Sequence, residues 1–154
     1  MEFNSIAIGI VVLVLFTAPI LYVIINSSKS DKKIKSQFNK LCTENGVSLT
    51  NYEVIGSAII GLDASLKKVM YSTLKDLENH FQVVDLSLVK NCNVKTVQPK
   101  KKHLELVELE LSGSKFHNEI IVYQEDDETL IADPQMCLHE VQKWEQLIKN
   151  NLNK

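Results

Sequence analysis

The sequence predicts an α+β protein: an N-terminal transmembrane helix, one antiparallel β domain of about seven strands, and a C-terminal helix that caps the domain. Three observations support this prediction. The stretch from Ile6 to Ile25 contains no charged residue. Short segments rich in branched apolar side chains alternate with turn residues from 54 to 132. Residues 133–152 have the start signals and apolar spacing of a helix. Short loops between antiparallel strands favour a β-sandwich or a partly open barrel.

The uncharged stretch from Ile6 to Ile25 has the length of a transmembrane helix. At about 1.5 Å per residue it covers roughly the 30 Å hydrocarbon core of a bilayer. A cleaved signal peptide is disfavoured, because no Lys or Arg precedes the stretch and its apolar run is too long. We therefore predict a retained anchor over residues 1–28 of a single-pass protein of the inner membrane.

Lysines follow the apolar stretch at Lys29, Lys32, Lys33 and Lys35, and none precedes it. Because flanking Lys and Arg stay on the cytoplasmic side of a membrane, we expect the N-terminus outside and the rest in the cytoplasm. We favour the setting of topology as the role of these lysines. The alternative role is contact with anionic lipid headgroups. In that case the same four lysines are the candidate lipid-binding site.

Composition excludes several classes of protein. The net charge is -2, all 17 cationic side chains are Lys, and Arg is absent, so we expect no nucleic-acid partner. The richness in Lys, Asn and Ile is typical of an AT-rich bacterial genome. Cys42, Cys92 and Cys137 are odd in number and far apart, which argues against a disulfide scaffold. We expect each thiol to be a small buried apolar group in a reducing compartment.

Residues 29–47 are predicted to form a juxtamembrane amphipathic helix. Ile34, Phe38 and Cys42 lie four residues apart and so share one helical face, and Gly46 is a stop signal. The helix either continues the anchor or is separated from it by a short polar break in "INSSKS".

The first half of the β domain is predicted to contain strands at 54–62 and 66–71, joined by the turn residues of "GLDAS". Gly56, inside the first of these, indicates a bulge or a close approach of another chain segment. Further strands are expected at 81–84 and 86–97.

The second half is predicted to contain three more strands. The segment 103–114 alternates Leu with Glu but slips phase at Leu106–Val107, so we expect a strand with a bulge and a solvent-facing row of Glu105, Glu108 and Glu110. Residues 118–124 form the next strand, and 129–132 a short last one.

The C-terminal helix has the clearest signals. Asp133 is a good N-cap, and Pro134 suits the first helical position. Val141, Trp144 and Ile148 recur at helical spacing, and we expect Trp144 to anchor the helix to the sheet.

This order of elements, with Trp144 in "HEVQKWEQLIKNNL", resembles the pleckstrin-homology-like fold. The segments "IIGLDASLKKVMYS" and "FQVVDLSLVKNCNV" also resemble small bacterial proteins that join a membrane anchor to such a domain. The resemblance assigns residues 48–154 to this domain and implies seven strands in two bent sheets with a C-terminal helix. Members that bind phosphoinositides use Lys and Arg around the first hairpin, where this chain has Lys67 and Lys68.

No catalytic motif is complete. His139 and Glu140 begin a zinc-protease motif, but Lys143 occupies the position of the second His. The acidic loop 125–128 lacks the alternating ligands of a calcium loop. We therefore expect no enzyme, no cofactor and no metal.

The favoured function is a cytoplasmic binding or scaffolding domain that holds an unidentified protein partner near the membrane. The contact surface is expected at an exposed strand edge or at a sheet face that the last helix leaves open. The alternative is a pilin-like or pseudopilin-like structural subunit with its domain outside the cytoplasm. Those subunits carry a positive leader and a processing Gly, which this sequence lacks.

Overall fold

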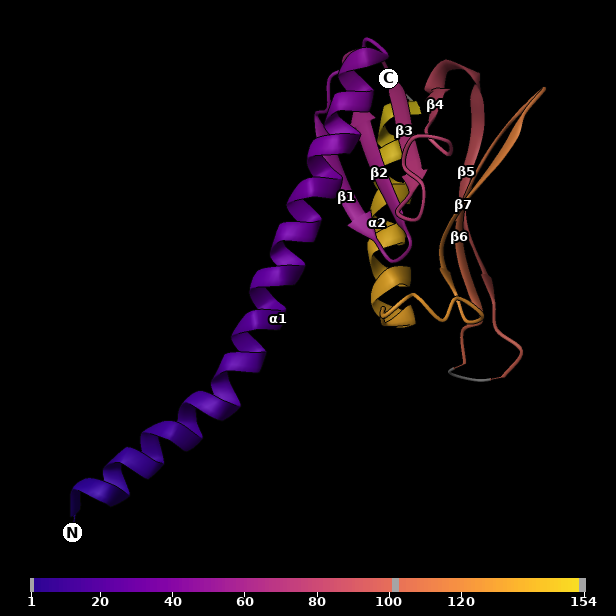
Figure 1. The fold of residues 1–154 in the computed structure, drawn as a ribbon. Helices are drawn as coiled ribbons and strands as arrows, with labels where there is room; N and C mark the ends of the chain where they lie inside the picture. The colour runs from indigo at the N-terminus through magenta and orange to yellow at the C-terminus, as the bar shows by residue number, and fades with distance from the viewer. Residues whose placement is uncertain (1, 101–102, 153–154) are drawn as a thin grey trace. The chain divides into compact units, whose positions relative to one another are not determined.

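The computed structural model describes residues 2–100 and 103–152, without the side chains of residues 2–7 and 20–29 (Figure 1). The chain divides into two compact units, residues 1–37 and 38–154. The helix α1 (Glu2–Glu44) begins in the first unit and ends in the second. It runs without interruption through "INSSKS", so the polar break considered from the sequence is absent.

The predicted transmembrane anchor over 1–28 is wrong. Among the residues that the structure describes, no helix combines the length and the apolar character needed to cross a membrane. The inner-membrane location and the placement of the domain in the cytoplasm depended on this anchor and are corrected with it.

The end of α1 belongs to the second unit and follows the predicted amphipathic pattern. Phe38 and Cys42 are fully buried. Gly46 has a φ of 70°, a left-handed conformation that favours glycine, and its amide donates to Thr43 O at 3.0 Å. The helix therefore ends where the sequence predicted.

A four-stranded antiparallel sheet follows, with the strand order β1-β2-β3-β4. Its strands are β1 (Asn51–Ile55), β2 (Ala58–Asp63), β3 (Lys68–Thr73) and β4 (Gln82–Asp85). The single strand expected at 54–62 is in fact a hairpin that turns at Gly56 and Ser57. Gly56 has a φ of 54°, and a Cβ there would collide with Val122 O, so the expected close approach is real.

A three-stranded antiparallel sheet completes the β domain, with the order β5-β6-β7. It follows a short 3-10 helix, η1 (Leu86–Leu88), and consists of β5 (Val89–Val97), β6 (Leu106–Gly113) and β7 (His117–Gln124). The pairing of β6 with β7 shifts register between Val107 and Glu108, where Val122 of β7 is the extra residue. The bulge therefore lies on β7 and not on the strand for which it was predicted. The strand expected at 129–132 is absent, and those residues lie outside regular structure.

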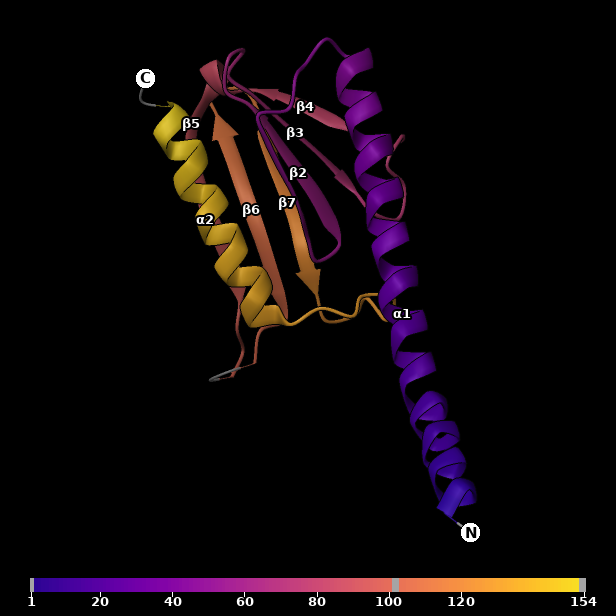
Figure 2. The same cartoon turned by 90° about the vertical axis from the view of Figure 1, so that its left-hand side faces the viewer.

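The last element is α2 (Pro134–Leu152). As predicted, Asp133 caps it: Asp133 Oδ1 accepts from the amides of Gln135 at 2.7 Å and Met136 at 3.1 Å. Figure 2 shows α2 along β6, and its buried face joins the core formed by both sheets. That face consists of Cys137, Val141, Trp144 and Ile148.

The second unit is thus α+β, with seven strands in sheets of four and three strands and a C-terminal helix. Its three thiols are free and buried, as the sequence predicted. Burial raises the pKa of Cys42 to about 11 and that of Cys92 to about 12, so both remain protonated thiols at neutral pH.

Candidate functional site

The lysines of the sequence-based site all belong to the first unit. Lys32 and Lys33 are exposed, and Lys35 is half-buried and engaged in an interaction. The side chain of Lys29 lies outside the described residues. Contact of these lysines with anionic headgroups stays a prediction.

Two of the four strand edges in the second unit are engaged by other segments. At β5, the Val94 amide donates to Glu145 Oε1 of α2 at 3.3 Å. At β7, Val122 O accepts from the Ser57 amide at 2.9 Å. The remaining edges belong to β1 and β4, at the two ends of the four-stranded sheet.

A groove of about 410 Å³ runs between β1 and α2. Four consecutive residues, 50–53, line one wall, while Lys143, Trp144 and Leu147 of α2 line the other. Successive side chains of a strand point to opposite faces of its sheet. A wall that includes four consecutive residues therefore follows the edge of the strand. We call this hollow the β1–α2 groove.

One hydrogen bond ties the two walls of the β1–α2 groove together. Trp144 is 3% exposed, and its Nε1 donates to Glu53 Oε2 at 2.9 Å. The prediction that Trp144 anchors the helix to the sheet is confirmed, since its ring lies in the shared core. The bond links α2 to β1 beside the groove.

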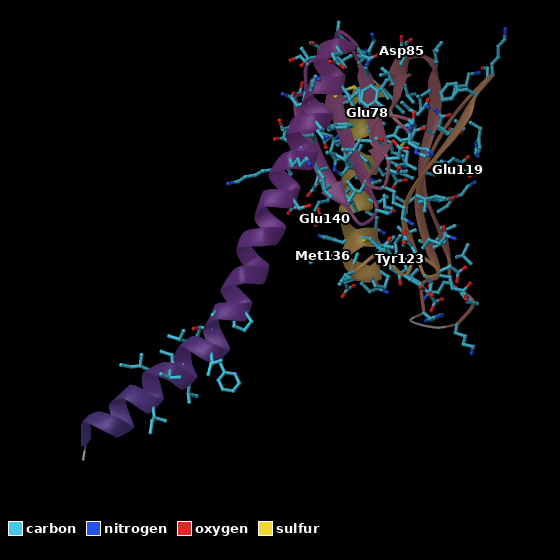
Figure 3. The ribbon with its side chains drawn as sticks, viewed as in Figure 1. Glu78, Asp85, Glu119, Tyr123, Met136 and Glu140 are labelled. Atoms are coloured by element: carbon cyan, nitrogen blue, oxygen red, sulfur yellow. The ribbon has the colours of Figure 1, made fainter. Side chains whose placement is uncertain are left out.

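The electrostatics of the groove are dominated by carboxylates. Lys143 Nζ donates to Glu140 Oε1 at 2.7 Å and Oε2 at 2.9 Å, and Figure 3 shows Glu140 on α2. This hydrogen bond from Lys143, followed by its charge, lowers the pKa of Glu140. Glu53 and Lys143 line the groove, whereas Glu140 lies outside its lining and pairs with Lys143. Because Glu140 already neutralises Lys143, the carboxylate of Glu53 favours a cationic ligand group.

A second hollow, of about 230 Å³, lies where β4 approaches the start of β7. Leu88 is 61% exposed beside it, and Val83 is 38% exposed. Its other lining residues include Phe116 and Asn118. The hollow is more apolar than the β1–α2 groove, but nothing on its walls selects a particular occupant.

The outer face of β6 differs from the predicted row of solvent-facing glutamates. Glu108 is only 7% exposed, and burial, together with the nearby charge of Glu119, raises the pKa of its carboxyl. Lys95 Nζ lies 2.6 Å from Glu110 Oε2. His117 places Nδ1 3.2 Å from Glu110 Oε1 and Nε2 2.8 Å from Glu119 Oε1. These ion pairs offset the repulsion among the carboxylates on this face.

A set of metal-ligating side chains lies at the opposite end of the same sheet. His103, Glu105 and Glu125 each offer one ligand atom, and these atoms lie within 4.8 Å of one another. The sequence gives no sign of this set, because His103 and Glu125 are 22 residues apart. They meet through the pairing of Leu106 with Gln124, and the register of that pairing is not readable from one sequence.

Comparison with family models, with curated proteins and with solved structures finds no match for this chain.

Proposed function

We propose that residues 38–154 form a protein-binding module of the pleckstrin-homology-like type, which holds a partner through an extended peptide bound in the β1–α2 groove. The observation that carries the proposal is the groove along the edge of β1. The sequence of elements supports the assignment of type: sheets of four and three strands precede a C-terminal helix with a buried Trp144.

An extended peptide suits this groove because β1 ends its sheet. In the β1–β2 hairpin, Ile55 pairs with Ala58 across a two-residue turn. The main-chain N–H and C=O groups of successive β1 residues therefore point alternately toward β2 and away from it. Val54 is in the set that faces away. A peptide strand added there gains main-chain hydrogen bonds, and its side chains reach Leu147 and the rim of Trp144.

The charges of the groove indicate a basic side chain in the peptide. Glu140 pairs with Lys143, so the carboxylate of Glu53 is the lining charge that a Lys or Arg of the partner can meet.

The test uses the full chain and a displayed library of random ten-residue peptides. We expect enriched peptides to share a basic residue among alternating apolar ones. An enriched peptide is then synthesised with N-methyl groups on one or the other alternate set of residues. Because an added strand pairs through every second residue, one set of methyl groups should weaken binding about tenfold or more, and the other should spare it.

A charge pair on the protein gives the matched control. K143E should strengthen binding of the basic peptide about two- to fivefold, since it removes the positive charge from the groove. K115E makes the same change of net charge at a residue that does not line the groove and should leave the affinity unchanged. The proposal is overturned if no peptide is enriched, if both N-methyl sets are equally tolerated, or if only K115E changes the affinity.

A further inference from the structure

We propose that His103, Glu105 and Glu125 form a binding site for a first-row divalent transition-metal ion, with Zn²⁺ as the best fit. The site lies at the end of the β5-β6-β7 sheet, where the chain enters β6 and leaves β7. It is independent of the peptide groove proposed above.

Backbone hydrogen bonds bring the three ligands together before any ion binds. The Glu125 amide donates to Glu105 O at 2.9 Å, and the Glu105 amide donates to Val97 O at 2.9 Å. The His103 amide donates to Lys100 O at 3.1 Å. Their main chains are thus fixed on a paired sheet end, and only the side chains have to move.

The side chains need small rotations to bind one ion. His103 Nε2 already lies 3.0 Å from Glu125 Oε2. Ligand atoms around a tetrahedral Zn²⁺ are about 3.4 Å apart, so the 4.8 Å spread of the set has to contract. The His103 and Glu125 side chains are 49% and 44% exposed, which leaves them free to turn and leaves water to complete the coordination.

The donor set selects the class of metal. One imidazole nitrogen with two carboxylates suits Zn²⁺ and its first-row neighbours. Ca²⁺ requires six to eight oxygen ligands, and Mg²⁺ a near-octahedral oxygen shell, and an imidazole satisfies neither. A bound ion would link the carboxylates of Glu105 and Glu125. The exposed His103–Glu125 pair is weak and does not link them.

His117 offers a natural comparison, because it also contacts two glutamates. Its two ring nitrogens contact different carboxylates, with Nδ1 near Glu110 and Nε2 near Glu119. One ion cannot collect both carboxylates and a single nitrogen from opposite edges of the ring. Lys95 Nζ also lies 2.6 Å from Glu110 and already neutralises it. We assign no metal to this second cluster.

Titration of the full chain with Zn²⁺, followed by calorimetry, tests the site. We expect one equivalent to bind, with a rise in the thermal midpoint. H103A and E125Q should each weaken binding about tenfold or more, since each removes one of three protein ligands. H117A is the control and should leave the affinity within about twofold. Co²⁺ in place of Zn²⁺ should give visible absorption that H103A abolishes and H117A retains.

Two results overturn the assignment. The first is the absence of saturable Zn²⁺ binding at a tenfold molar excess of ion over protein. The second is binding that H117A weakens as much as H103A does, or that neither variant changes. Circular dichroism of each variant without metal separates loss of a ligand from loss of the fold.

Discussion

The carboxylate of Asp63 joins the β2–β3 turn to the segment between α1 and β1. Its side chain is 1% exposed. Asp63 Oδ2 accepts from the Ser48 amide at 2.8 Å. Asp63 Oδ1 accepts from the Ser65 amide and the Leu66 amide, both at 3.0 Å, and from the Ser65 hydroxyl at 2.6 Å. D63N keeps the size of the side chain but sets an amide NH₂ against the Ser48 donor, so that donor is left unsatisfied.

The cost of this change can be worked from the pKa. The hydrogen bond from Ser65, together with the backbone amides of Leu66, Ser48 and Ser65, lowers the pKa of Asp63 from 3.8 to about 2, against the opposing effect of burial. At about 1.36 kcal/mol per pKa unit, the folded state favours the carboxylate by about 2.4 kcal/mol. An unsatisfied buried donor costs about 1–3 kcal/mol. We expect D63N to lower the free energy of unfolding by about 2–3 kcal/mol at pH 7.

Urea denaturation of the full chain measures this loss, with the exposed Asp126 as the control site for D126N. A lowered carboxyl pKa gives stability that is present above the unfolded-state pKa and lost as the pH falls through the folded-state value. The difference between wild type and D63N should therefore be constant from pH 7 to about 5 and shrink between about 4 and 2. A loss no larger than that of D126N, or a difference unchanged at pH 2.5, would refute the reasoning.

The remaining predictions concern three other positions. G56A should lower the free energy of unfolding by about 3 kcal/mol or more, because Gly56 has a φ of 54° and the new Cβ would meet Val122 O. G46A places its Cβ in open space and should lower it by only about 1 kcal/mol. Urea denaturation compares the two variants. W144F loses the indole donor and part of the core contact, so we expect a loss of about 1–3 kcal/mol in the same assay. E108Q should raise the thermal midpoint at pH 7. The raised pKa of Glu108 means that its ionised form is disfavoured in the folded state, so the gain should vanish as the pH falls below the unfolded-state pKa. A gain of the same size at pH 3 would contradict that cause.

The sequence predicted an element's end correctly where residues at that end, such as a helix cap, determine it. Asp133 and Pro134 mark the start of α2, and both act as their chemistry predicts. The hairpin at Gly56 was misread because a glycine inside an apolar run indicates a bulge or a turn equally well. Only the two-residue spacing between Ile55 and Ala58 in the folded sheet decides between them.

The strand expected at 129–132 shows how turn chemistry competes with composition. Asp127 Oδ1 accepts from the Thr129 amide at 3.1 Å and from its hydroxyl at 2.6 Å, which bends the chain away from an extended path. Ile131 is consequently fully exposed despite its branched apolar side chain. Apolar composition alone predicted burial here, and the nearby aspartate overrode it.

The candidate sites were the least predictable part of the chain. The β1–α2 groove joins residues 50–53 to residues that follow 90 positions later, and the metal-ligating set depends on the register of β6 with β7. Neither placement leaves a local sequence signal. The apolar stretch at 6–25 has such a signal, yet no helix among the described residues is long and apolar enough to cross a membrane.

The burial of the three thiols makes each one a reporter of its own segment. Cys42 lies at the end of α1, Cys92 on β5 and Cys137 at the start of α2. A thiol-specific alkylating reagent can reach each sulfur only when that segment opens. The relative rates of alkylation therefore rank the three segments by local opening free energy, in the native chain and without an attached label.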